Sequence, residues 1–147
     1  MTVSFCGHNR FPNSEETEQW LTDVVSNLIE QGATHFYLGG YGGFDRLALR
    51  VMKKQKKLHP NIQYILVLAY LDRARDVEVA KDYDSTIFPP LESVPLRLAI
   101  VRRNTWMAEV CDVMVARVDY DWGGAATTLA HARQKKKRII LNPNYNE

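Results

Sequence analysis

The chain has 147 residues, and its 19 Lys and Arg against 17 Asp and Glu give a formal net charge of +2. With 46% hydrophobic and 24% charged residues, the composition excludes a disordered chain and predicts one soluble domain that spans residues 1–147. The near-neutral charge disfavours bulk nucleic-acid binding, because proteins that neutralise many phosphates usually carry a strong basic excess or a basic stripe.

The cysteines and the longest apolar run indicate the compartment. Cys6 and Cys111 lie in apolar segments without paired spacing, so neither a disulfide framework nor a metal site is expected. Residues 65–70 are the longest apolar run, far shorter than the ~20 residues that span a bilayer, and no basic start precedes an apolar leader segment. The sequence therefore predicts a cytoplasmic protein with no membrane partner, no metal and no other cofactor.

Strand-like and helix-like segments alternate along the chain. Residues 2–6 are short, apolar and β-prone, which predicts a buried strand. A helix follows, with Asn13 as its N-cap and apolar residues at helical spacing up to Gly32. A second strand over 35–38 then leads through a glycine cluster into a helix over 45–57.

The second half of the chain continues the alternation. Residues 62–70 are nearly all apolar, which is typical of a strand covered on both faces. A short helix over 73–81 and an ordered, proline-containing loop over 84–95 are predicted next. The remaining predicted elements are a helix over 95–110, a strand over 113–118, a loop over 119–124, a helix over 125–136 and a strand over 138–141.

Five strands that alternate with helices predict an α/β fold, a Rossmann-like three-layer sandwich with a five-stranded, mainly parallel sheet. In open α/β sheets, ligands bind outside the carboxyl ends of the strands, near the point where the strand order reverses. The segments that directly follow the predicted strands are therefore the candidate binding segments, and three of them have unusual chemistry.

The first candidate segment follows the first strand and contains Gly7, His8 and Arg10. Glycine permits a sharp turn, and the two side chains place donors and positive charge where an anionic ligand could bind. A plain turn with solvated polar residues explains the same pattern about equally well.

The second candidate segment is the glycine cluster of residues 39–45. Four glycines in five positions favour close approach of a phosphate or ribose, and the following helix offers N–H groups. The cluster is neither a P-loop nor the dinucleotide fingerprint, because the lysine and the third glycine of those motifs are missing. Asp45 is alternatively a helix cap. The candidate binding residues here are Gly39, Gly40, Gly42, Gly43 and Asp45.

The third candidate segment, residues 119–128, follows the fourth predicted strand. Two glycines, small residues and two hydroxyls predict a second helix N-terminus that can accept a phosphate. Tyr120 and Trp122 are available to stack on a base, although packing is the commoner role of such aromatics. The candidate binding residues here are Asp121, Trp122, Gly123, Gly124, Thr127 and Thr128.

The order of the motifs resembles the SLOG superfamily, which includes the Smf/DprA proteins, the LOG phosphoribohydrolases and the YpsA-like proteins. The motifs are Gly-His-x-Arg, Gly-Gly-x-Gly-Gly-x-Asp, Arg-Arg-Asn-x-x-Met, Cys-Asp-x-x-x-Ala and Gly-Gly-Ala-Ala-Thr-Thr. The resemblance covers nearly the whole chain, is weakest over 73–95 and is strongest to the YpsA-like branch. It implies a Rossmannoid sheet that binds a nucleotide or nucleotide-derived ligand, frequently in a dimer.

The resemblance also bears on catalysis. LOG enzymes cleave the N-glycosidic bond of nucleoside monophosphates with an arginine and a glutamate; Arg103 matches the arginine, whereas Ala130 stands at the place of the glutamate. Asn104 stands where these enzymes usually have a lysine. A hydrolase would need another carboxylate, for which Asp121 is the first candidate and Asp45 or Asp119 are others.

The sequence thus predicts a protein that binds a nucleotide or nucleotide-derived small molecule, ADP-ribose-like molecules included, as a sensor or sequestering protein. The alternative is a nucleoside-monophosphate N-glycosidase with Arg103 and Asp121 as its catalytic residues, and the third candidate is DprA-like binding of single-stranded DNA. A homodimer is expected from the resemblance and from the apolar residues on more than one face of the helix over 95–110. Nucleic acid is not the expected partner.

Overall fold

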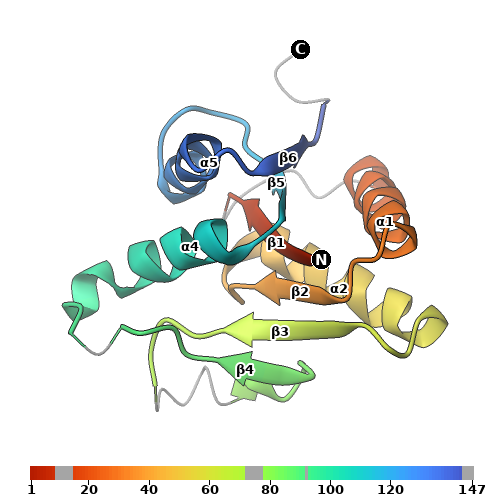
Figure 1. Cartoon of the computed structure of the whole chain (residues 1–147), viewed down its shortest axis with the longest axis horizontal. Coiled ribbons are helices and arrows are strands. Elements are labelled where there is room, and N and C mark those ends of the chain that lie inside the picture. The colour runs from red at the N-terminus through yellow and green to blue at the C-terminus, as the bar shows by residue number, and fades with distance from the viewer. Residues whose placement is uncertain (9–14, 72–77, 92, 144–147) are drawn as a thin grey trace.

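The computed structural model describes residues 1–8, 15–71, 78–91 and 93–143 (Figure 1). Its centre is a six-stranded sheet in the order β4-β3-β2-β1-β5-β6, in which every neighbouring pair of strands is parallel. The strands are β1 (Thr2–Gly7), β2 (His35–Leu38), β3 (Gln63–Val67), β4 (Ser85–Ile87), β5 (Val113–Arg117) and β6 (Arg138–Leu141).

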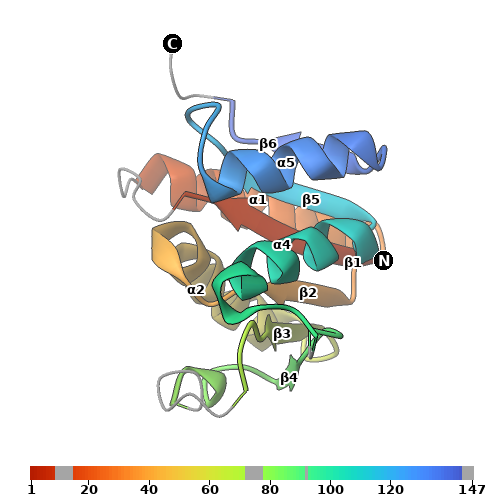
Figure 2. The ribbon, with the colours of Figure 1, turned by 90° about the vertical axis from the view of Figure 1, so that its left-hand side faces the viewer.

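Helices cover both faces of the sheet, as Figures 1 and 2 show. Two helices, α1 and α2, lie on one face, and α4 and α5 lie on the other. The bounds are α1 (Glu15–Glu30), α2 (Gly42–Leu58), a short 3-10 turn η1 (Leu96–Leu98), α4 (Ala99–Val110) and α5 (Gly124–Gln134). The predicted Rossmann-like sandwich is confirmed.

The central strand β1 shows why this layering forms. Successive side chains of a strand point to opposite faces, so Val3 and Phe5 pack into the core beneath α1 and α2. Cys6 instead packs beneath α4 and α5, and the Ser4 hydroxyl donates a hydrogen bond to the carbonyl of Met107 in α4, at 3.0 Å. Both faces of β1 are buried, as is typical of a strand at the centre of a parallel sheet.

The prediction of five strands is wrong, because the sheet has six. The sixth, β4, lies inside residues 84–95, which were predicted to be a loop. It is only three residues long and pairs with β3 alone, at the sheet edge. Ser85 and Thr86 are exposed, so the segment lacks the apolar run that marks the buried strands.

Some element boundaries also differ from the prediction. The helix predicted from residue 45 begins at Gly42, and the strand predicted over 62–70 ends at Val67. The helix predicted over 95–110 begins as the turn η1. Asn13, the predicted N-cap, and residues 73–77 of the predicted short helix lie outside the described residues. Within the part of the chain that the structure describes, no helix has the length and hydrophobicity needed to cross a membrane.

Candidate functional site

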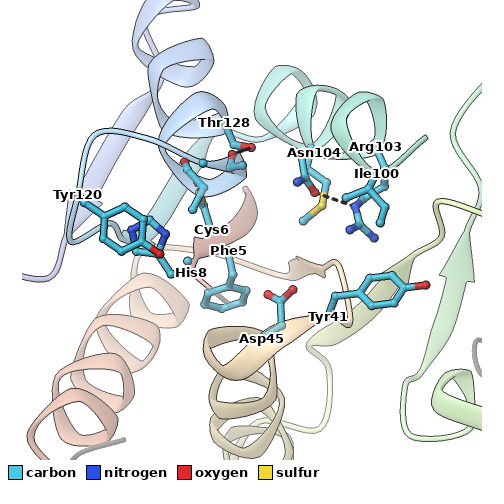
Figure 3. Close-up of a pocket in the computed structure, with 15 residues that line it drawn as sticks. Phe5, Cys6, His8, Tyr41, Asp45, Ile100, Arg103, Asn104, Tyr120 and Thr128 are labelled. Atoms are coloured by element: carbon cyan, nitrogen blue, oxygen red, sulfur yellow. Dashed lines mark hydrogen bonds between the residues drawn. The ribbon is translucent and has the colours of Figure 1, made fainter. Parts of the chain in front are cut away.

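A cavity of about 320 Å³ opens at the carboxyl ends of β1 and β5 (Figure 3). These two strands are neighbours at the point where the strand order reverses, which is the position where open α/β sheets bind ligands. Five segments form its wall: the end of β1, the start of α2, one face of α4, the loop after β5 and the start of α5. The lining residues are Phe5, Cys6, Gly7, His8, Tyr41, Asp45, Ile100, Arg103, Asn104, Met107, Tyr120, Gly123, Gly124, Ala125 and Thr128.

The N-terminus of α5 faces this cavity. Gly123 precedes the helix with φ 90°, a conformation that side chains disfavour, and Gly124 is the first helical residue. A Cβ atom on Gly124 would meet no atom within 4 Å, so the space beside this backbone is open. The first N–H groups of a helix lack intrahelical acceptors and carry its positive dipole end, so they suit an anion.

The glycine cluster before α2 has a structural explanation. Gly40 has φ +80°, and a Cβ there would lie 2.6 Å from Leu66 Cδ1. A Cβ on Gly39 would lie 3.0 Å from the Cζ of Arg103. The cluster lets the backbone pass close to β3 and α4, and its four glycines are not among the lining residues of the cavity.

Arg103 is buried in the wall of the cavity with only 2% of its surface exposed. Its Nη1 donates hydrogen bonds to the carbonyl oxygens of Gly39 and Val67, at 2.8 and 3.0 Å. Its guanidinium also lies over the ring of Tyr41, 5.4 Å from the centroid. Arg103 therefore ties α4 to the carboxyl ends of β2 and β3, in addition to lining the cavity.

Asn104 is a cavity residue that the sequence analysis did not select as a binding residue. Its Oδ1 accepts a hydrogen bond from Arg103 Nε, at 2.8 Å (Figure 3). A sequence signal for it exists, since Ile100, Arg103, Asn104 and Met107 stand at i, i+3, i+4 and i+7 of α4 and share one helical face. The sequence analysis used the apolar residues of this helix only as an argument for a homodimer.

Asp45 supplies the one carboxylate among the described residues that line the cavity. Burial raises its pKa to about 6, while the Arg103 charge and hydrogen bonding with the backbone of Tyr41, Gly39 and Gly40 oppose that rise. At pH 7 and above the carboxyl group is therefore mostly ionised, and it accepts hydrogen bonds.

A stack of three aromatic rings stands beside the cavity. The ring centroids of His8 and Tyr120 are 3.6 Å apart with 11° between the planes, and those of Tyr120 and Trp122 are 4.1 Å apart. His8 Nε2 accepts a hydrogen bond from the backbone N–H of Asp119, at 2.9 Å, so the ring is neutral with its proton on Nδ1. Trp122 is 67% exposed, so the outer end of the stack lies in solvent.

Cys6 lies in the wall, where its surroundings favour the thiol over the thiolate. Its thiol donates to the carbonyl of Ala125, at 3.2 Å, and burial, with smaller effects of Asp45 and Cys111, raises its pKa to about 12. No group of His, Cys, Asp and Glu side chains suited to a metal ion occurs within the described ranges.

The structure brings together part of the set of residues predicted from the sequence. The predicted residues that line the cavity are Gly7, His8, Asp45, Arg103, Gly123, Gly124 and Thr128. Those that do not are Gly39, Gly40, Gly42, Gly43, Asp121, Trp122 and Thr127, and Arg10 lies outside the described residues. The lining residues that were not predicted are Phe5, Cys6, Tyr41, Ile100, Asn104, Met107, Tyr120 and Ala125, of which Tyr120 was noted only for stacking.

Comparison with known proteins shows similarity in structure only. No family model and no curated protein matches the sequence. The DNA processing protein A (DprA) of Streptococcus pneumoniae is similar, with a TM-score of 0.70 and 17% identity over 99% of this chain and 51% of the other chain. The chain thus spans about half the length of that protein.

Two further structures have the same fold. The DprA of Helicobacter pylori, whose single-stranded DNA binding has been described, matches with a TM-score of 0.64 and 17% identity, over 100% of this chain and 67% of the other. The molybdenum cofactor carrier protein of Chlamydomonas reinhardtii matches with a TM-score of 0.62 and 19% identity, over 95% and 74%. The similarity confirms the predicted Rossmann-like fold, whereas membership of the SLOG superfamily and of its YpsA-like branch stays a prediction.

Proposed function

We propose that the cavity binds a nucleotide or nucleotide-derived small molecule, and that the protein acts as a sensor or sequestering protein. The observation that carries this proposal is the position of the cavity, at the switch point of the sheet with the N-terminus of α5 open into it at Gly124. The order of the sequence motifs supports assignment to the SLOG superfamily and its YpsA-like branch.

The phosphate of the ligand is assigned to the start of α5. Gly123, Gly124 and Ala125 line the cavity there, and their backbone offers N–H donors. The Thr128 hydroxyl lies on the same turn, where it donates to the carbonyl of Gly124 at 2.8 Å. None of the four glycines before and at the start of α2, which we also expected to contact phosphate, lines the cavity. Gly39 lies close to Arg103, and Gly40 lies close to Leu66.

The glycosidase alternative loses its first candidate carboxylate. Asp121 is exposed and is not a lining residue, and Asp119 pairs with Arg117 at 3.2 Å. Ala130, at the place of the LOG glutamate, is also exposed. A hydrolase would therefore have to use Asp45, whose carboxylate faces the cavity (Figure 3).

The DNA-binding alternative has less support than a small molecule. Three lysines of α2 form ion pairs with acidic residues of this chain instead of presenting a free basic surface. These pairs are Lys53 with Asp82, Lys54 with Glu18 and Lys56 with Asp84. The ion pairs of α2 therefore give no support to DNA binding at this helix.

A substitution at Gly124 tests the proposed function. Titrating AMP, GMP, CMP, UMP and ADP-ribose by calorimetry should identify at least one ligand, and Gly124→Val should weaken it by tenfold or more. A Cβ atom at this position would meet no atom within 4 Å, so the valine side chain would extend into the open space beside the helix N-terminus.

Ala130→Val is the matched control, because Ala130 is an exposed residue of α5 outside the cavity wall. The substitution introduces the same valine side chain on the same helix. Parental affinity in Gly124→Val, at an unchanged melting temperature, would contradict the phosphate assignment. Sustained release of free base from a nucleotide, followed by chromatography, would favour the glycosidase instead.

A further inference from the structure

The stack of His8, Tyr120 and Trp122 extends the site beyond the cavity, and the inference drawn from it rests on the proposed function. His8 and Tyr120 line the cavity and stand together on one side of it, across from Arg103 (Figure 3). Trp122 stacks on Tyr120 with 4.1 Å between the ring centroids and 28° between the planes, but it is not a lining residue. The stack therefore continues from the cavity wall to the surface of the protein.

Trp122 presents an open aromatic face at the outer end of this stack. The residue is 67% exposed although one face of its indole lies against Tyr120, so the other face is open to solvent. Packing within the chain thus accounts for one face of the indole only. Tyr120 is itself held against His8, whose ring accepts a hydrogen bond from the backbone N–H of Asp119 at 2.9 Å. Two rings therefore support the open indole face before any ligand binds.

The stack lies beside the helix N-terminus to which the ligand phosphate is assigned. Trp122 directly precedes Gly123, and two residues of chain span at most ~7 Å, so the backbone of Trp122 is within that distance of Gly124. A Cβ atom on Gly123 would lie 3.9 Å from the ring of Tyr120. The base and the 5′-phosphate of a nucleotide are joined by a single ribose, so one nucleotide can reach both the stack and the start of α5.

We propose that Trp122 is the platform for the base of the bound nucleotide, which adds a fourth ring to the stack. Every base has a π-face, so stacking recognises an aromatic base without reading its hydrogen-bonding edge. The two fused rings of a purine cover more of the indole than a pyrimidine does, so purine nucleotides are the favoured class of ligand. The binding site then consists of the cavity, the start of α5 and the open face of Trp122.

AMP and ribose 5-phosphate, which has a hydroxyl group in place of the base, separate the platform from the phosphate site. In calorimetry the wild-type protein should bind AMP more tightly by about fivefold to 100-fold, the contribution of one base stacked on an aromatic side chain. Trp122→Leu should bring this ratio close to one by weakening AMP, and it should leave the affinity for ribose 5-phosphate unchanged. Trp122→Phe should keep part of the preference, because phenylalanine retains a smaller ring. Gly124→Val should instead weaken both compounds.

Fluorescence gives a second readout, at the indole itself. A base stacked on Trp122 should quench its emission, so AMP should lower the tryptophan fluorescence of the wild-type protein. The same titration should leave the fluorescence of Trp122→Phe unchanged, although this variant keeps Trp20 and Trp106.

Leu58→Ala is the control, because Leu58 is an exposed apolar residue of α2 that does not line the cavity. Melting temperatures verify that each variant is folded. Unchanged AMP affinity in Trp122→Leu, or equal affinity of the wild-type protein for AMP and ribose 5-phosphate, would overturn this inference and leave the proposed function standing. Failure of every nucleotide to bind the wild-type protein would instead overturn the proposed function.

Discussion

On the residue scale, the contacts of Arg103 give it a structural role in addition to its place in the cavity wall. The sequence analysis matched Arg103 to a catalytic arginine of the LOG enzymes, and the structure shows that Arg103 is also buried and bonded to two backbone carbonyls. Replacing it leaves the carbonyls of Gly39 and Val67 without this donor in a buried environment, where an unsatisfied polar group costs ~1–3 kcal/mol.

We therefore expect Arg103→Ala to lower the free energy of unfolding by about 2–4 kcal/mol, measured by urea denaturation. Arg102→Ala is the matched control, since Arg102 is the exposed neighbour on the same helix and its loss should change stability by less than about 0.5 kcal/mol. An Arg103→Ala protein that keeps wild-type stability but loses ligand affinity would contradict this structural role and would favour a direct contact between Arg103 and the ligand.

His8 makes stability depend on pH. Burial lowers its pKa below the usual 6.5, the Arg117 charge adds to this effect and Asp119 opposes it. The unfolded state then binds a proton on His8 more readily than the folded state does. The contribution of neutral His8 to the free energy of unfolding is therefore complete above pH 6.5 and is lost as the pH falls through the folded-state pKa. Protonation of Nε2 also removes the acceptor for the Asp119 N–H.

Comparing wild type with His8→Phe isolates this effect, because phenylalanine retains an aromatic ring beside Tyr120 but does not titrate. The variant should be less stable by about 1–2 kcal/mol at pH 7.5, where the Asp119 N–H loses its acceptor. The difference should shrink toward pH 5. Asp45 titrates in both proteins, so its effect cancels from the difference in stability between them. A stability difference that stays constant with pH would contradict the role given to His8.

On the element scale, periodicity predicted most of the fold. Strands β1, β2, β5 and β6 were located because their apolar runs are bounded by glycine, turn residues or charged segments. The short edge strand β4 was missed, since pairing with β3, rather than its own composition, makes it a strand. Local sequence does not contain that information.

The candidate site was predictable to a similar degree. Residues directly after strands, such as His8 and Gly124, were found because parallel strands end at one edge of the sheet. Asn104 and Met107 lie in the middle of α4, and only the crossing of this helix over the strand ends brings them to the cavity. Conversely, Gly39 and Gly40 leave room for side chains that come from α4 and β3, and no local sequence pattern reveals these contacts.

At the scale of the whole molecule, η1 and α4 leave an apolar surface exposed. Leu96 is 69% exposed and Val101 48%, and Leu98, Ile100 and Val110 are also exposed. Exposed apolar side chains gathered on one element can mark an interface, and a stable interface buries ~800 Å² on each partner. Ile100 also lines the cavity, so a partner on this surface would lie beside the cavity.

We expect the protein to form a homodimer through this surface. Light scattering at micromolar concentration should give twice the 16.9 kDa mass of one chain. Val101→Glu should shift the mass to that of a monomer, because a charge buried in an apolar interface costs several kcal/mol. Leu58→Glu is the control: Leu58 is 71% exposed on α2, on the opposite face of the sheet, so this substitution should leave the dimer mass unchanged. A wild-type mass of 16.9 kDa would rule the dimer out, and a dimer that persists in Val101→Glu would move the interface to another surface.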